Sequence, residues 1–185
     1  MRLVVLGGGE SGVGTAILGQ KQGYEVFVSD FGKIKQSYKD VLDKYGIPWE
    51  EEQHTEALIL NATVVMKSPG IPDKAPIVKK LVEKGISVIS EIEFTAPFTN
   101  AITIGITGSN GKTTTTSIIY EIMKRAFGDK VVLAGNIGTP LCHYVKNIKS
   151  GDYLVMEISD HQLCDMYDFK TNTSIITNIY ECHTD

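Results

Sequence analysis

The chain has 185 residues, of which 42% are hydrophobic and 22% are charged, a balance that argues against intrinsic disorder and favours a folded globular protein. Its net charge of -4 and pI near 5.6 provide no overall basic field, which excludes binding to a nucleic-acid backbone by charge alone. Any phosphate ligand must therefore be held by local groups.

The cysteine count and the length of the apolar runs indicate the cellular compartment. Cys142, Cys164 and Cys182 are odd in number and lack CxxC spacing, so the sequence predicts neither a disulfide framework nor a zinc site. The apolar run at residues 3–6 is too short for the hydrophobic region of a signal peptide, and no run is long enough to cross a membrane. We therefore expect a cytoplasmic protein with no nucleic-acid partner and no membrane partner.

In the first half of the chain, short apolar runs alternate with segments of helical period, as in βα units that build a parallel sheet. The sequence predicts a strand at residues 2–6, a glycine-rich turn, a helix closed by Gly23, and a second strand at residues 25–29. A buried strand at residues 62–66 ends at Ser68-Pro69-Gly70, a helix around residues 77–82 stops at Gly85, and a further strand follows at residues 86–89.

The pattern loses its rhythm between residues 91 and 100, where Pro97 and Asn100 indicate a hinge. We expect two domains, 1–97 and 98–185. The second resumes with a strand at 101–106, a glycine-rich loop, a helix with apolar residues at helical spacing, and strands at 130–134, 153–158 and 173–178. The predicted class is α/β, with a Rossmann-like parallel-sheet domain followed by a truncated P-loop domain, because no closing helix follows the last strand.

The segment Thr107 to Thr114, TGSNGKTT, has the properties of a phosphate-binding loop between a buried strand and an amphipathic helix. Its glycines allow successive N–H groups to face one concavity, Lys112 supplies a cation, and the Thr113 hydroxyl can ligate Mg²⁺. The strict motif has glycine where this chain has Ile106, so a chance Gly-Lys-Thr turn is the alternative. The residues predicted to bind the phosphates of ATP are Gly108, Ser109, Asn110, Gly111, Lys112, Thr113 and Thr114.

A second glycine-rich turn, GGGESG at residues 7–12, matches GxGxxG after a strand, and Asp30 follows about twenty residues later, where an acid can accept a ribose hydroxyl. Ser68-Pro69-Gly70 ends a later strand and would face the same crevice. The alternatives are a structural tight turn without a ligand and a nicotinamide-dependent oxidoreductase domain. The second alternative leaves the loop around Lys112 unexplained.

Other charged residues give weaker signals. His54, His143 and His161 have no partners at ligand spacing, and we expect them at the surface. Lys33, Lys35 and Lys39 could face a phosphate, although a solvated helix face is the better interpretation of this cluster.

Taken together, the motifs resemble those of the Mur ligases along the whole chain. The resemblance rests on GGGESGVG, on SPGIP from residue 68, on SEIEF from residue 90, on TGSNGKTTTT, on AGNIGTP from residue 134, and on MEIS with MYDF from residue 166. It implies a three-domain enzyme that binds a UDP-sugar, ATP and an amino acid in successive domains. This chain would hold the first domain and part of the second.

The resemblance further implies a reaction and its participants. ATP with Mg²⁺ would phosphorylate the carboxylate of UDP-N-acetylmuramoyl-L-alanine, and the amine of D-glutamate, held by the absent third domain, would attack the acyl phosphate. A carboxylate at neutral pH is a poor electrophile, so a phosphate leaving group must be installed and its charge neutralised.

The resemblance also assigns roles to particular residues. Ser11, Gly12, Asp30, Ser68 and Gly70 correspond to the uridine diphosphate site, and Asn136 and Ser159 to positions near the muramoyl portion. The catalytic residues would be Lys112, Glu157 and His183, and the metal ligands would be Thr113, Glu157 and His183.

Two segments depart from the family pattern. Asp160 and His161 replace a serine and a phenylalanine, and Tyr180-Glu181-Cys182 replaces a Thr-Pro-Asp sequence before His183. We therefore expect that these 185 residues alone do not complete the ligation. A relative that binds UDP-sugar or ATP without catalysis stays open as the alternative.

Overall fold

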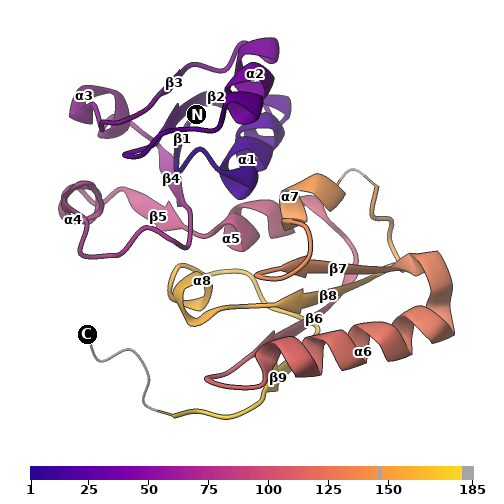
Figure 1. Ribbon diagram of the computed structural model, residues 1–185. Helices are drawn as coiled ribbons and strands as arrows, with labels where there is room; N and C mark the ends of the chain where they lie inside the picture. Colours follow the sequence, from indigo (N-terminus) through magenta and orange to yellow (C-terminus); the bar gives the residue numbers. More distant parts are fainter. Residues whose placement is uncertain (146, 181–185) are drawn as a thin grey trace. The chain divides into compact units, whose positions relative to one another are not determined.

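The computed structural model describes residues 1–145 and 147–180 and divides the chain into two compact units, of which the first is Met1–Thr95 and the second begins at Ala96 (Figure 1). Each unit is built on its own sheet, and every strand pair in both sheets is parallel. The α/β class with parallel sheets is therefore confirmed.

The first unit is a five-stranded sheet in the order β3-β2-β1-β4-β5. Its elements in chain order are β1 (Arg2–Leu6), α1 (Glu10–Lys21), β2 (Glu25–Ser29), α2 (Gln36–Lys44), β3 (Trp49–Glu50), α3 (Glu56–Ile59), β4 (Val64–Lys67), α4 (Pro76–Glu83), β5 (Ser87–Ile89) and α5 (Glu91–Thr95).

Helices cover both faces of this sheet, which explains why its strands read as continuous apolar runs. On one face, Ile59 of α3 and Leu81 of α4 pack with Val4 and Leu6 of β1 in a buried cluster. On the other face α1 lies close to the sheet, since a Cβ on Gly19 would be 2.5 Å from a methyl of Leu3. Alternate residues of β1 therefore serve opposite cores.

The second unit is a four-stranded sheet in the order β7-β8-β6-β9. Its elements are η1 (Ala96–Phe98), β6 (Ile102–Thr107), α6 (Lys112–Phe127), η2 (Gly128–Lys130), β7 (Val131–Gly135), α7 (Leu141–Tyr144), β8 (Tyr153–Glu157), α8 (Asp160–Cys164) and β9 (Thr173–Ile176). Figure 1 shows α6 running along one face of this sheet, where Ile119 and Met123 pack on the buried residues Ile106, Val131 and Val155.

Both sheets bring loops from distant parts of the sequence to one edge. In the first unit β1 lies between β2 and β4, so the loops after these three strands meet at their carboxyl ends. In the second unit β6 lies between β8 and β9, so the loop before α6 is flanked by the ends of both neighbours. Such edges are where open α/β sheets bind ligands.

Where an element was predicted, the observed one differs mainly at its ends. The strand predicted at 173–178 ends at Ile176, because Thr177 and Asn178 turn to bond with the loop before α6. Strand β3 and the helices α2, α3, α5, α7 and α8 were not predicted. Helix α2 buries only Leu42, and the other missed elements have two to five residues each, too few to show a period. Among the residues the structure describes, no helix combines the length and apolarity that crossing a membrane requires.

Candidate functional site

The loop between β6 and α6 leaves the start of the helix open to a ligand. Gly111 is the N-cap of α6, adopts a left-handed conformation with φ of 80°, and has no side chain to cap the helix. The first N–H groups of a helix have no partner within the helix, and they carry its partial positive charge. The 16-residue helix α6 therefore presents uncapped donors at Lys112, Thr113 and Thr114.

Lys112 folds back over this loop. Its ammonium group donates to the carbonyl oxygens of Gly108 at 2.6 Å and Ser109 at 3.3 Å. The cation thus lies over the loop that precedes α6, where it can exchange these neutral acceptors for a charged phosphate oxygen.

The end of β9 fixes the shape of the loop. The N–H of Ser109 donates to the carbonyl oxygen of Asn178 at 3.0 Å, and the N–H of Asn110 donates to the Oδ1 atom of Asn178 at 2.9 Å. The hydroxyl of Thr177 donates to the carbonyl oxygen of Asn110 at 2.6 Å. Two of the amides predicted to bind phosphate are therefore paired with Asn178 in this conformation, which leaves the helix N-terminus as the main source of donors.

Glu157 ends β8 beside the loop, in register with Ile106 of β6. The side chain is 1% exposed; Oε1 accepts a hydrogen bond from the Asn136 amide at 2.7 Å, whereas Oε2 is buried with no partner among the described residues. A buried carboxylate oxygen without a donor is costly unless a cation satisfies it. The pair Glu157 and Asn136 therefore fits Mg²⁺, which prefers oxygen ligands.

The other predicted ligands of this region are placed as follows. Thr113 is exposed in the first turn of α6. Ser159 is buried and caps α8, where its hydroxyl accepts the N–H of Gln162. His183 lies outside the described residues. Within residues 1–145 and 147–180, no group of three His, Cys, Asp or Glu side chains is close enough together to hold a metal.

A cavity of about 300 Å³ adjoins this loop. Lys112, Asp160 and Asn178 contribute to its polar lining, and Leu163, Ile176 and Tyr180 contribute apolar surface. Asp160, one of the two residues that depart from the family pattern after β8, thus shares a cavity with Lys112. Sequence reasoning missed Asn178; a polar residue directly after a strand that neighbours β6 is the signal that could have found it.

In the first unit, the GxGxxG turn is tightly closed. Gly7 has φ of 102°, and a Cβ there would be 2.4 Å from the hydroxyl of Ser68. A Cβ on Gly12 would be 1.9 Å from the carbonyl oxygen of Gly7. Asp30 accepts the N–H of Gly8 at 2.6 Å through one carboxylate oxygen and the N–H of Gly32 at 2.8 Å through the other. The structure therefore brings Gly12, Asp30 and Ser68 together and gives each a part in shaping the turn.

A cavity of about 390 Å³ opens beside this turn. Asp30 and Gly70, both predicted to contact a uridine diphosphate, line it. Ser11 lies in the first turn of α1. Phe31 and His54 also line the cavity, and no motif in the sequence pointed to them. His54 is half-buried, so the expectation of a surface histidine was wrong.

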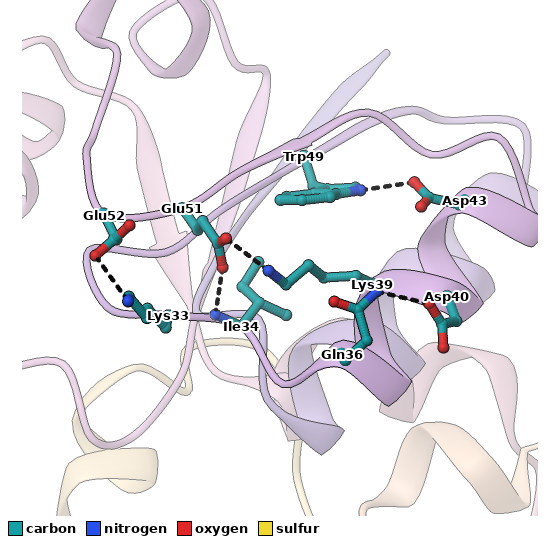
Figure 2. Close-up of polar contacts among 9 residues, drawn as sticks. All are labelled: Lys33, Ile34, Gln36, Lys39, Asp40, Asp43, Trp49, Glu51 and Glu52. Carbon is teal, nitrogen blue, oxygen red and sulfur yellow. Dashed lines mark hydrogen bonds and ion pairs between the residues drawn. The ribbon is translucent and has the colours of Figure 1, made fainter.

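Two lysines after β2, Lys33 and Lys39, form ion pairs. The ammonium group of Lys39 lies 2.6 Å from Glu51 and 5.4 Å from the ring centroid of Trp49, and that of Lys33 lies 3.8 Å from Glu52 (Figure 2). The second carboxylate oxygen of Glu51 accepts the N–H of Ile34 at 2.8 Å. These contacts hold the loop that carries Phe31, and they account for Lys33 and Lys39 without a phosphate.

Comparison with known proteins gives two family matches. Residues 2–77 match the MurD N-terminal domain, and residues 106–185 match the Mur ligase middle domain. The chain is 53% identical over 184 residues to the UDP-N-acetylmuramoylalanine--D-glutamate ligase of Christiangramia forsetii, and equally to that of Bacteroides thetaiotaomicron. In both cases the match covers 100% of this chain and 41% of the relative, so the chain spans about two fifths of these curated relatives.

Solved structures show the same fold. The chain matches UDP-N-acetylmuramate:L-alanyl-gamma-D-glutamyl-meso-diaminopimelate ligase from Neisseria meningitidis with a TM-score of 0.58 at 19% identity, covering 100% of this chain and 62% of that one. It matches UDP-N-acetylmuramate-alanine ligase MurC from Thermotoga maritima with a TM-score of 0.52 at 20% identity, covering 97% of this chain and 41% of that one. At these identities the likeness concerns the fold alone.

Proposed function

The chain belongs to the Mur ligase family, and from this premise we propose that it is the N-terminal part of an ATP-dependent ligase that adds D-glutamate to UDP-N-acetylmuramoyl-L-alanine. The first unit binds the UDP-sugar beside the GxGxxG turn, and the second binds ATP at the start of α6. D-glutamate is held by a part of the ligase beyond this chain. Because all three substrates are polar metabolites of peptidoglycan precursor synthesis, we place the reaction in the cytoplasm.

The observation that carries this proposal is the uncapped start of α6 beside Lys112 and the buried oxygen of Glu157. Bound ATP with Mg²⁺ supplies the phosphoryl group that makes the substrate carboxylate reactive. The helix N-terminus and Lys112 hold the negative charge of the phosphates, and Glu157 and Thr113 provide oxygen ligands for the metal. His183 is proposed as a further metal ligand from the family pattern.

Ligand titration and turnover test this function. We expect calorimetry to detect binding of Mg²⁺-ATP and of a UDP-sugar but not of NADH, which an oxidoreductase would bind. We also expect no ADP release in the presence of UDP-N-acetylmuramoyl-L-alanine and D-glutamate, because the chain spans only 41% of its relatives. Turnover by the purified 185 residues would disprove the expected inactivity, and tight NADH binding without UDP-sugar binding would disprove the ligase assignment.

A second candidate is a relative that binds these nucleotides without catalysis. It is favoured by Asp160, which lines the cavity beside Lys112 and adds a negative charge near the phosphate loop. Replacing Asp160 and His161 with the serine and phenylalanine of the family pattern separates the two. A large gain in Mg²⁺-ATP affinity would show that Asp160 weakens the site for the metal-bound triphosphate that catalysis needs, which favours the non-catalytic relative; unchanged affinity would favour the ligase.

A further inference from the structure

Glu50, Ser29 and His54 form a chain of hydrogen bonds in the first unit, and His54 also lines the cavity beside the glycine-rich turn. The Ser29 hydroxyl oxygen is 2.7 Å from Oε1 of Glu50 and 2.7 Å from Nδ1 of His54. Ser29 is completely buried and Glu50 is 8% exposed. Glu50 also accepts the N–H of Thr55 at 2.8 Å and the hydroxyl of Thr55 at 2.6 Å. Three donors therefore converge on one carboxyl group.

These contacts determine where the hydrogens lie. Burial raises the pKa of Glu50, but the hydrogen bonds from Thr55 and Ser29 and the nearby His54 outweigh it and lower the pKa below 4.5. Glu50 is thus an ionised carboxylate that only accepts. Ser29 has a single hydrogen, and the carboxylate at 2.7 Å takes it in preference to the carbonyl oxygen of Gln53 at 3.4 Å. The Ser29 oxygen must then accept the Nδ1–H of His54.

The remaining ring nitrogen of His54 is a hydrogen-bond acceptor. Burial lowers the pKa of His54 below 6.5, although the charges of Glu50 and Asp30 act in the opposite direction, so the ring is neutral at pH 7. A neutral imidazole has one N–H, and Nδ1 carries it. Nε2 therefore has a free lone pair, and within the described part of the chain only Nδ1 has a hydrogen-bond partner.

His54 lies in the wall of the cavity of about 390 Å³, next to an exposed aromatic ring. The rings of His54 and Phe31 are 5.7 Å apart at 41°, and Phe31 is 75% exposed. Ile71, Pro72 and Ile77 add apolar surface to the same cavity. The charged groups near His54 are Glu50, which accepts the hydroxyl of Ser29, Asp30 after β2, and Glu56 of α3, which pairs with Lys80. Flat apolar walls with one oriented acceptor are suited to a nucleobase.

We propose that His54 is a specificity-determining residue whose Nε2 accepts the imide N–H of a uracil base packed against Phe31. The proposal rests on the proposed function, since the base belongs to the UDP-sugar. Uracil presents an N–H donor at N3, whereas cytosine presents an acceptor nitrogen at the same position. The lone pair of the cytosine N3 would therefore face the lone pair of Nε2. A buried acceptor facing an acceptor is costly, and we expect about 10- to 100-fold discrimination between the two bases.

The test compares UDP-glucose with CDP-glucose, which differ only in the base. We expect the unmodified chain to bind UDP-glucose about 10- to 100-fold more tightly, and His54→Phe, which keeps the ring and removes the acceptor, to lose most of this preference. Ser29→Ala should reduce the preference as well, because both tautomers of His54 then become accessible. His143→Phe is the matched control at an exposed histidine outside the cavity, and it should leave the preference unchanged.

Two measurements on the unmodified protein keep the test independent of how the variants fold. ¹⁵N spectra of the histidine rings should identify His54 as the Nδ1–H tautomer without any ligand. Binding of UDP-glucose, whose diphosphate does not titrate in this range, should weaken as the pH falls through the pKa of His54 below 6.5, because a protonated ring has no acceptor.

The outcomes separate this inference from the proposed function. If UDP-glucose binds but the base preference survives in His54→Phe, or if the ring proton is found on Nε2, the role of His54 is wrong and the UDP-sugar site stands. If neither nucleotide sugar binds, the UDP-sugar site and the role of His54 both fall. Uracil preference that depends on His54 and on its tautomer supports both.

Discussion

Lys112 is the side chain on which the proposed nucleotide binding should depend most. Its ammonium group now bonds to the carbonyl oxygens of Gly108 and Ser109, and a charge-assisted bond to phosphate is stronger than these neutral ones. We expect Lys112→Ala to weaken Mg²⁺-ATP binding about 10- to 100-fold in calorimetry. Lys124→Ala is the control, since Lys124 lies on the same helix and pairs with Asp129. Equal affinity in Lys112→Ala and the unmodified chain would contradict the proposed ATP site.

Gly108 has a different importance, because the loop leaves no room for a side chain at this position. It has φ of 133°, and a Cβ there would be 2.2 Å from the hydroxyl of Thr177 and 2.8 Å from the carbonyl oxygen of Asn178. Gly151 also has positive φ, at 89°, but a Cβ there would meet nothing within 4 Å. We expect Gly108→Ala to lower the free energy of unfolding about 1–3 kcal/mol more than Gly151→Ala, because only the first adds a steric clash. Urea denaturation of the two variants measures the difference; equal losses would show that the loop moves to make room.

At the level of elements, the loop between β2 and α2 is held in place by a network of hydrogen bonds and an ion pair to Glu51, a residue outside the loop. Glu51, which directly follows β3, binds both Lys39 of α2 and the N–H of Ile34 (Figure 2). Ile34 in turn lies against Gly8, since a Cβ on Gly8 would be 2.6 Å from its side chain. The network therefore positions the loop of Phe31 beside the glycine-rich turn.

This network predicts a pH dependence. The hydrogen bond from Lys39, followed by that from the Ile34 N–H, lowers the pKa of Glu51 below 4.5. A carboxyl group with a lowered folded-state pKa contributes stability above its unfolded pKa and loses it as the pH falls through the folded value. We expect the urea midpoint of the unmodified chain to fall between neutral pH and about pH 3, and Glu51→Gln to show a smaller fall.

The control for this experiment is Glu52→Gln, because Glu52 and Lys33 are both exposed and lie 3.8 Å apart. Exposed pairs of this kind contribute little, so this variant should follow the unmodified chain across the pH range. An identical pH profile for Glu51→Gln and Glu52→Gln would contradict the role of Glu51.

At the level of the whole molecule, the two units have separate sheets and separate cores. A unit with its own core can fold alone. We expect residues 1–95, expressed by themselves, to give a circular dichroism spectrum of mixed helix and sheet and one cooperative urea transition. Far-ultraviolet ellipticity typical of a disordered chain would show instead that the first unit depends on the second.

Local patterns in the sequence determined much of this protein. Apolar runs and helical spacing located β1, α1, β2, α4 and α6, and the glycine-rich turns marked both loops at which ligands are expected. These signals are visible because each depends on residues within a few positions of one another: a strand needs a continuous apolar run, and a turn with positive φ needs glycine. The resemblance to the Mur ligases added Glu157 and Asn136 as proposed site residues.

Only the tertiary structure decided which polar groups already have hydrogen-bond partners within the protein and which can bind a ligand. Asn178 meets Asn110 from 68 residues away, and Ser29 meets His54 from 25 residues away. Strand order in the sheets creates these contacts, since β9 lies beside β6 and the ends of parallel strands share one edge. Neither hydrophobic periodicity nor turn residues predict the order of the strands. That order depends on how the helices bury both faces of each sheet.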